Sequence, residues 1–185
     1  MLVVTEPAQL PVHEAKAGDP EAWEVLFRRY QLPLYVYVFE LVRNEQTSLD
    51  LVQETFIAAA RHIGSLRDDA RFGSWLFGIA HQKCIQLWRA NKHEDVPLEK
   101  LPELSHDAED APDDILIRQE AEEHVLALLG RLPVDQRSAL LLNCVEGFSL
   151  QEVAEITGVP VGTVKSRLHN AKRAMRKLLE RYEDT

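Results

Sequence analysis

Apolar residues recur at helical spacing along most of the chain, and no segment alternates apolar and polar residues over a useful length, as a strand would. Asp19 and Pro20 form a favourable helix start, because aspartate caps free N–H groups and proline fits the first turn. The core-facing positions that follow, at i, i+3, i+4 and i+7, are Trp23, Leu26, Phe27 and Tyr30. Residues 32–42 are apolar on all sides, as in a helix buried in a bundle. We therefore predict an all-α fold.

The next predicted helix begins with Thr47 or Ser48 as its cap and ends near Gly64. Its buried side comprises Leu49, Val52, Phe56, Ala59 and Ile63. A mixed polar and apolar strip lies opposite, formed by Asp50, Gln53, Glu54 and Ile57. Such a strip is either solvated surface or a docking face, and composition alone favours solvated surface.

A polar turn at 65–71 precedes a helix predicted over about 72–91, with Phe72, Trp75, Leu76, Ile79 and Leu87 as its core side. The far end of this helix combines basic and aromatic residues, namely Lys83, Trp88, Arg89 and Lys92. Aromatic rings stack on unpaired bases while cations follow the phosphates, so the combination can bind single-stranded nucleic acid. Aromatic residues on a helix are nevertheless more often part of the core.

Residues 93–114 have no periodicity, three prolines and many acids, which predicts an extended linker. A helix is expected to resume near Asp113, with inward positions Ile117, Ala121, Val125, Leu128 and Leu132. Pro133 then opens a helix that Gly147 ends, and its apolar residues are Leu140, Leu141, Cys144 and Val145. We expect an arm at 1–18, a helical bundle at 19–92, the linker at 93–114 and a second helical domain at 115–185.

The second domain ends in a short helix, a turn and a long helix. Ser149 and Glu152 match a capping box, and the turn at 157–160 contains Gly158 and Pro160. In the long helix one apolar stripe comprises Val164, Leu168, Ala171, Met175 and Leu178. Between Thr163 and Arg181 there are seven basic residues and one acid. The pattern predicts a helix-turn-helix that places its second helix in the DNA major groove, although an ordinary solvated basic helix is the commoner alternative.

The charge distribution removes the main objection to DNA binding, a net charge of −9. Residues 94–125 have a net charge of −10, whereas residues 126–185 have a net charge of +2. Cys84 and Cys144 both lie in apolar helical patterns, which predicts buried free thiols of a cytosolic protein. No signal peptide or membrane span is expected, and His81 with Cys84 is too weak a pair to predict a metal site.

Three stretches resemble the extracytoplasmic-function (ECF) sigma factors, a small branch of the sigma-70 family of bacterial RNA polymerase. Residues 49–56 (LDLVQETF) are similar to the signature helix of the N-terminal domain, region 2, and residues 72–80 (FGSWLFGIA) to the promoter-melting segment. Residues 132–137, 147–149 and 158–168 (GVPVGTVKSRL) resemble the helix-turn-helix domain, region 4. The likeness covers residues 18–92 and 115–181, and both halves in this order are highly specific.

The resemblance implies a cytoplasmic initiation factor that needs no cofactor or metal and is not an enzyme. Its partners would be core RNA polymerase (β′ clamp and β flap), promoter DNA and an anti-sigma factor. The residues assigned to the polymerase are Asp50, Gln53, Glu54 and Phe56. The turn at 65–71 and the helix at 72–92 would read and open the upstream edge of the −10 element. The residues assigned to this role are Phe72, Trp75, Lys83, Trp88 and Arg89. Those assigned to the −35 element are Thr163, Lys165, Ser166, Arg167, His169, Lys172 and Arg173.

One segment departs from the family pattern. Relatives often have asparagine and aspartate after the Ile-Ala pair, where this chain has Gln82 and Gln86 and keeps Arg89. The main alternative function is a stand-alone helix-turn-helix repressor, which would bind duplex DNA unaided. An enzyme is a distant third, because no phosphate loop, metal set or nucleophile motif is present in the sequence.

Overall fold

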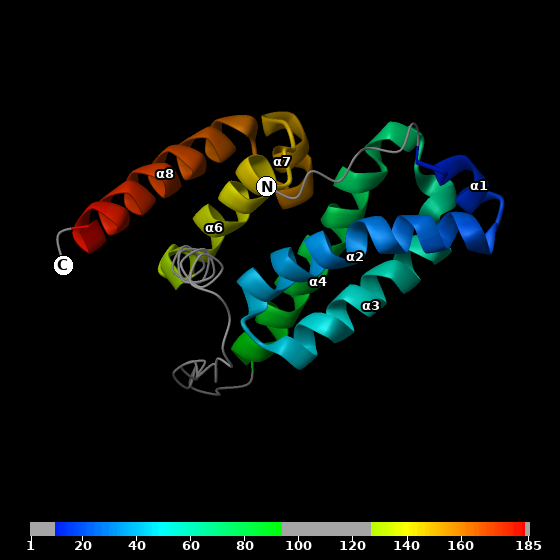
Figure 1. The fold of residues 1–185 in the computed structure, drawn as a ribbon, viewed down its shortest axis with the longest axis horizontal. Coiled ribbons are helices and arrows are strands. Elements are labelled where there is room, and N and C mark those ends of the chain that lie inside the picture. Colours follow the sequence, from blue (N-terminus) through cyan, green and yellow to red (C-terminus); the bar gives the residue numbers. More distant parts are fainter. Residues whose placement is uncertain (1–9, 94–126, 184–185) are drawn as a thin grey trace, which may run out of the picture.

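The computed structural model describes residues 10–93 and 127–183, and every regular element in these ranges is helical (Figure 1). The N-terminal half contains α1 (Val12–Lys16), α2 (Pro20–Val42), α3 (Glu45–His62), the 3-10 turns η1 (Ile63–Ser65) and η2 (Asp69–Arg71), and α4 (Phe72–His93). The C-terminal half is helical at 127–130 and continues with α6 (Val134–Leu140), the π-helical turn η3 (Leu141–Val145), α7 (Leu150–Thr157) and α8 (Val161–Glu183). The all-α prediction is confirmed.

Helix α2 begins as predicted and is one unbroken element. The Asp19 side chain accepts a hydrogen bond from the Glu21 backbone N–H at 2.9 Å, and Pro20 occupies the first turn. The helix continues through Pro33 and ends where Arg43 adopts a left-handed backbone with φ 57°. An internal proline removes one backbone hydrogen bond. Packing of α2 against α3 and α4 compensates for that loss.

Helix α3 starts earlier than predicted. Asn44 is its cap, with a side-chain oxygen that accepts from the Thr47 N–H at 2.9 Å, and Ser48 is buried in the first turn. The sequence pattern missed this cap because Thr47 and Ser48 also fit the role. Of the predicted buried side, Leu49 is the exception, because 47% of its surface is exposed.

The predicted helix-turn-helix is present in the C-terminal half. Ser149 and Glu152 form the capping box, with the Ser149 N–H donating to Glu152 Oε2 at 2.9 Å. Gly158 ends α7 with φ 69°, a conformation that glycine adopts without strain. On α8 the predicted stripe faces inward, since Val164, Leu168 and Ala171 are buried and Met175 and Leu178 are half-buried.

Two expectations for the preceding segment are wrong. Cys144 is exposed, and Val145 is 62% exposed, although both were expected inside. The cause is η3, because a π-helical turn has more residues per turn and rotates the side chains out of the α-helical register. Cys84 is buried as predicted. The predicted linker at 93–114 and the expected inward positions Ile117, Ala121 and Val125 lie, except for His93, outside the described residues.

The two halves pack directly against each other (Figure 1). Helix α7 lies on α4, and α6 lies on α2, while α8 packs on α6 and α7. The rings of Phe77 and Phe148 join the halves at a centroid distance of 5.2 Å. Buried side chains of both halves form one continuous hydrophobic cluster. The arrangement is therefore closed, with the helix-turn-helix held on the N-terminal bundle.

Candidate nucleic-acid and protein interfaces

The outer face of α3 combines acidic, amide and large apolar side chains at its surface. Asp50, Gln53 and Glu54 are exposed, and so are Leu49 and Ile57, at 47% and 46%. Exposed aliphatic residues beside acids on a rigid helix are typical of a protein-docking surface. The face thus has more apolar area than its sequence pattern indicated.

Phe56 does not belong to this exposed face. Only 8% of its surface is exposed, and its ring packs on Phe27 at a centroid distance of 4.8 Å. Phe27 is itself 42% exposed, although it was predicted in the core. Phe56 therefore packs α3 against α2. It lies beneath the exposed face of α3 and supports that face without being part of it.

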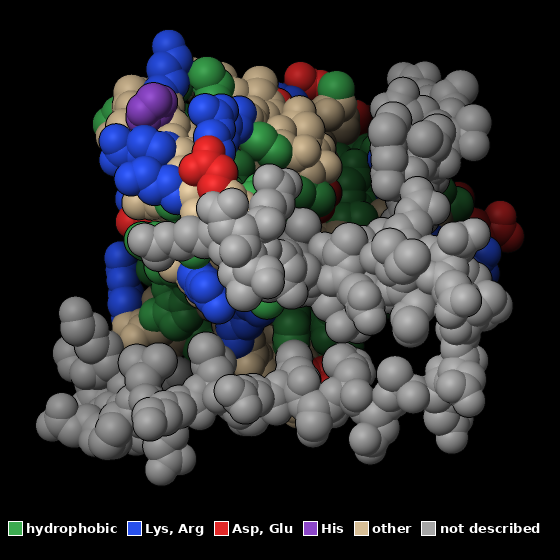
Figure 2. Space-filling view, turned by 60° about the vertical axis from the view of Figure 1, so that its left-hand side comes forward, with side chains coloured by type: hydrophobic (Ala, Val, Ile, Leu, Met, Phe, Trp, Pro, Cys, Tyr) green, Lys and Arg blue, Asp and Glu red, His purple; other side chains and the backbone are tan. Residues whose placement is uncertain are grey.

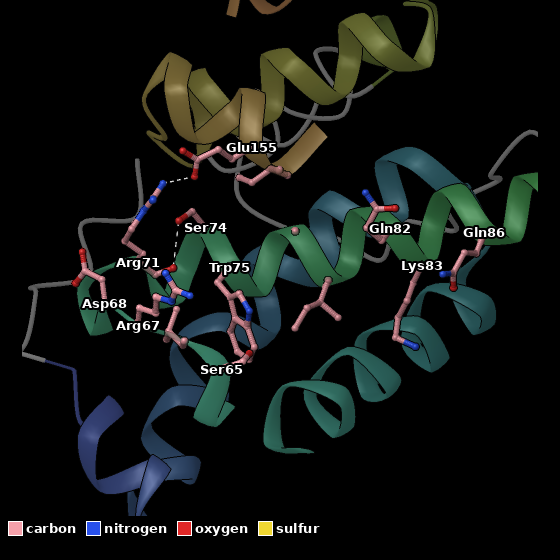
Figure 3. Close-up of a pocket in the computed structure, with 14 residues that line it drawn as sticks. Ser65, Arg67, Asp68, Arg71, Ser74, Trp75, Gln82, Lys83, Gln86 and Glu155 are labelled. Carbon is pink, nitrogen blue, oxygen red and sulfur yellow. Dashed lines mark hydrogen bonds and ion pairs between the residues drawn. The ribbon is translucent and has the colours of Figure 1, made fainter. Parts of the chain in front are cut away.

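An open groove of about 710 Å³ runs along α4 and is the second candidate site (Figure 3). One end is formed by the turn at 65–71, and α4 contributes Trp75, Gln82, Lys83 and Gln86. Trp75 is half-buried, so one part of its indole faces the groove. Lys83 reaches across to Glu54 on α3 at 2.8 Å. A half-exposed aromatic ring with nearby cations suits a single nucleic-acid strand.

The other predicted −10 residues do not line this groove. Phe72 is fully buried and packs on Trp75, Tyr30 and Trp23, with centroid distances of 5.9, 5.5 and 6.4 Å. It holds the Trp75 ring in place from beneath and lies too deep for DNA contact. Trp88 is half-buried and Arg89 exposed farther along α4, beyond the residues that line the groove.

Two arginines at the end of the groove were not singled out individually, although the resemblance assigned the turn at 65–71 that contains them to the −10 element. Arg67 and Arg71 line the groove from the polar turn that precedes α4, and Arg71 is the last residue of η2 (Figure 3). Arg71 forms an ion pair with Glu155 of α7, in the other half of the chain. The sequence feature that could have identified them is their spacing of four residues in a polar turn directly before the helix that contains Phe72 and Trp75.

The outer face of α8 is the third candidate site. Lysine and arginine side chains gather on the end of the molecule to which α8 belongs (Figure 2). Five predicted −35 residues are exposed there, namely Lys165, Ser166, His169, Lys172 and Arg173. Thr163 is half-buried. Exposed lysine and arginine side chains of this kind bind DNA phosphates.

Arg167 differs from the other predicted −35 residues. Its guanidinium donates to Asp135 Oδ2 on α6 at 2.7 Å, and only 23% of its side chain is exposed. Lys172 also has a second environment, because with Arg176 it borders an apolar hollow of about 380 Å³ between α6, η3 and α8. Leu140, Val145 and Leu179 line that hollow.

Buried polar groups connect the two halves beneath these surfaces. The Tyr37 hydroxyl lies 2.8 Å from His81 Nδ1 and 2.8 Å from Ser138 Oγ. Burial lowers the pKa of His81 to about 4, with Asp135 raising it and Arg167 lowering it, and burial raises the pKa of Tyr37. His81 is therefore neutral and hydrogen-bonded to Tyr37. Burial also raises the pKa of the nearby Cys84 thiol to about 12.

A second buried connection involves Arg137 of α6. Its Nη1 donates to the Glu40 carbonyl oxygen at 2.5 Å, and its Nη2 donates to the Leu132 carbonyl at 3.2 Å. Glu40 is buried and forms an ion pair with Arg43. Burial raises the pKa of Glu40, and both arginines lower it.

A helical bundle joined to a helix-turn-helix with a basic outer face is typical of a DNA-binding transcription factor. Family models of sigma-70 region 2 and sigma-70 region 4 match residues 26–94 and 123–175. The RNA polymerase sigma-H factor of Pseudomonas aeruginosa is 32% identical, with 97% of each chain covered. The ECF RNA polymerase sigma factor SigW of Bacillus subtilis is 30% identical over 91% of this chain and 94% of that protein. The chain belongs to the ECF sigma factors, a family of transcription regulators.

Solved structures of similar fold include two complexes, one of them between a sigma factor and an anti-sigma factor. CnrH in complex with the cytosolic domain of CnrY has a TM-score of 0.66 and 25% identity, covering 92% of this chain and 95% of that one. RpoE from Bartonella quintana, in complex with the anti-sigma factor NepR, has a TM-score of 0.67 and 25% identity, covering 84% and 96%. None of the helices within residues 10–93 and 127–183 has the length and hydropathy that a membrane span requires.

Proposed function

We propose that this ECF sigma factor binds core RNA polymerase through α3, reads the −35 element with α8, and binds and opens the −10 element along the α4 groove. The observation that supports this most is the presence of three separate surfaces of matching chemistry on one chain, described above. An anti-sigma factor is a further proposed partner, because the sigma factor RpoE, of similar fold, is solved in complex with the anti-sigma factor NepR.

The apolar hollow on the C-terminal half supports a second polymerase contact. Its aliphatic walls are bordered by the cations of Lys172 and Arg176. An amphipathic helix with acidic flanks fits such a surface. We assign it to the β flap of polymerase, which leaves the rest of α8 free for DNA.

Run-off transcription with purified core polymerase tests the proposed function directly. Promoter-specific transcripts are expected only when this protein is added to core. Tight binding to duplex DNA without polymerase, and no transcripts with it, would instead favour the stand-alone repressor.

Replacing Gln53 and Glu54 together with alanine is expected to weaken binding to core polymerase by about 2 kcal/mol, the size of an interface hot spot. The free energy of unfolding is expected to change by only about 0.5 kcal/mol, because both side chains are exposed and the Glu54–Lys83 ion pair is superficial. Fluorescence anisotropy with labelled protein and core measures the affinity, and a thermal melt measures stability.

The matched control for that variant replaces Glu24 and Gln31 with alanine. Both lie exposed on α2, and Glu24 also forms a surface ion pair, with Arg28. The control is expected to bind core normally. Wild-type affinity in the Gln53 and Glu54 variant would show that α3 is not the docking surface.

Lys165→Ala and Arg167→Ala are expected to weaken −35 binding in different ways. Loss of a phosphate contact at Lys165 lowers affinity evenly across sequences and reduces the salt dependence by about one unit. Loss of a base contact at Arg167 costs about 1–3 kcal/mol and relaxes the preference at one position. Holoenzyme binding to a set of −35 variants at several salt concentrations distinguishes these results.

Asp135→Ala is the control for Arg167, because it removes the same ion pair and leaves the arginine intact. This variant is expected to keep the −35 preference. An unchanged preference in Arg167→Ala as well would mean that Arg167 serves only to join α6 and α8.

A further inference from the structure

The α4 groove has walls from both halves of the chain. The turn at 65–71 and α4 form most of it, while Glu155 and Ile156 of α7 close one side (Figure 3). The cationic end of the groove is therefore covered by the first helix of the helix-turn-helix. A strand that enters the groove must meet α7 there.

The contact at that end is an ion pair between Arg71 and Glu155 (Figure 3). A second interaction holds the carboxylate, because Gln151 Nε2 donates to Glu155 Oε1 at 3.2 Å. Glu152 adds a second negative charge nearby. Its partial burial alone would raise its pKa, but hydrogen bonds from Ser149 and the charge of Arg71 outweigh burial, and the pKa lies below the usual value.

Arginine binds carboxylate and phosphate oxygens with the same planar fork of N–H donors. Arg71 therefore has, in this closed arrangement, the partner that most resembles a nucleic-acid phosphate. The half-buried Trp75 ring lines the same groove and offers a stacking surface for a base. An anion contact and a stacking surface in one groove are the two parts that a single-strand site requires.

We propose that Arg71 is a phosphate contact of the strand that binds this groove, and that Glu155 occupies the phosphate position while the two halves are packed together. The proposal rests on the proposed function of the groove. It makes α7 a competitor of the promoter strand, so the helix-turn-helix must leave α4 before the strand can bind.

The ion pair between Arg71 and Glu155 is weak enough for a strand phosphate to replace Glu155. Arg71 and Glu155 are 42% and 45% exposed, so their pair is weak and screened by salt. The buried bonds of Tyr37 and Arg137 hold α6 on the N-terminal bundle and α7 with it. Glu155 therefore occupies the anion position and contributes only a small part of the free energy that holds the two halves together.

Binding of a fluorescent single-stranded −10 oligonucleotide to the full chain, measured by anisotropy at low salt, tests the proposal. Glu155→Gln is expected to tighten binding by about 1.5- to 5-fold, which corresponds to the free energy of one exposed ion pair. Arg71→Gln is expected to weaken binding by about tenfold, as for a lost charged hydrogen bond. In the Arg71→Gln background, Glu155→Gln is expected to have no further effect.

Glu24→Gln is the matched control, because it removes the same charge and also breaks a surface ion pair with an arginine, Arg28. It is expected to bind the strand like wild type. An equal gain from Glu155→Gln with and without Arg71 would reveal general repulsion and overturn the proposal. No gain from Glu155→Gln, or no detectable strand binding by that variant, would also overturn it.

The same variants separate this proposal from the proposed function. Normal strand binding by Arg71→Gln in the free chain, together with normal promoter opening by its holoenzyme, would show that the groove is not the strand site. Weakened binding by Arg71→Gln without any gain from Glu155→Gln would leave the groove intact and reject only the competition by α7.

Discussion

Replacing Arg137 with alanine is expected to lower the free energy of unfolding by about 3 kcal/mol, the cost of breaking a buried charge network. Arg137 is 8% exposed and donates to the Glu40 and Leu132 carbonyls at 2.5 and 3.2 Å. Glu40 is 2% exposed and would retain only Arg43 as a countercharge. The truncation thus removes two hydrogen bonds and one of two nearby cations. Urea unfolding at neutral pH measures the loss.

Two variants control for this result. Arg131→Ala removes an exposed arginine a short distance before α6 and is expected to shift stability by only about 0.5 kcal/mol. Arg137→Lys keeps the charge without the fork of donors and is expected to lie between the two. A wild-type unfolding curve for Arg137→Ala would mean that the halves are not joined by this network.

Acidification from pH 7 to pH 5 is expected to cost the closed fold about 2 kcal/mol through His81 alone. Burial lowers the folded-state pKa of His81 to about 4, while the unfolded chain has a value near 6.5. Between these values the unfolded chain binds more protons, so this contribution is complete above about pH 6.5 and is lost as the pH falls toward 4. The His81 ring also shares a hydrogen bond with the Tyr37 hydroxyl at 2.8 Å, so a change in its protonation alters the buried connection between the halves. Urea unfolding across this pH range measures the effect.

The buried carboxyl groups require a differential measurement. Burial raises the pKa of Glu40 and of Glu146, and protonation of these groups on acidification stabilises the fold, which opposes the effect of His81. The test is therefore the difference between wild type and His81→Gln, with His13→Gln as the exposed control. Parallel pH curves for wild type and His81→Gln would contradict the prediction.

Local signals were sufficient for most of the fold. Capping residues and breakers act on neighbouring backbone groups, so Asp19, the Ser149 box and Gly158 marked helix ends that the structure confirms. Helical periodicity also located the inward stripe of α8 and most of the buried side of α3. Caps, breakers and periodicity depend on residues that are close together in the sequence, so they can be predicted from it. The errors at Asn44 and η3 arose where two caps competed or where the helical period changed.

The details of the sites depended on contacts between distant residues. Periodicity placed Phe56 and Phe72 on the buried sides of their helices, whereas the family resemblance assigned both to binding sites. Packing against Phe27 and Tyr30 shows that both rings lie beneath the surface. The pairs that join the halves connect residues 101 positions apart for Tyr37 and Ser138, and 84 apart for Arg71 and Glu155. Such pairings leave no periodic mark in a single sequence.

The amino-acid order alone therefore determined an all-α chain with a capped helix-turn-helix, a basic last helix and a polar strip on α3, because each follows from neighbours within a few turns. The closed packing of α7 on α4, and with it the carboxylate of Glu155 at Arg71, was decided by tertiary structure. The physical reason is that burial and ion pairing depend on which surfaces meet in space. Which surfaces contact each other is determined by the packing of the whole core and by no single segment.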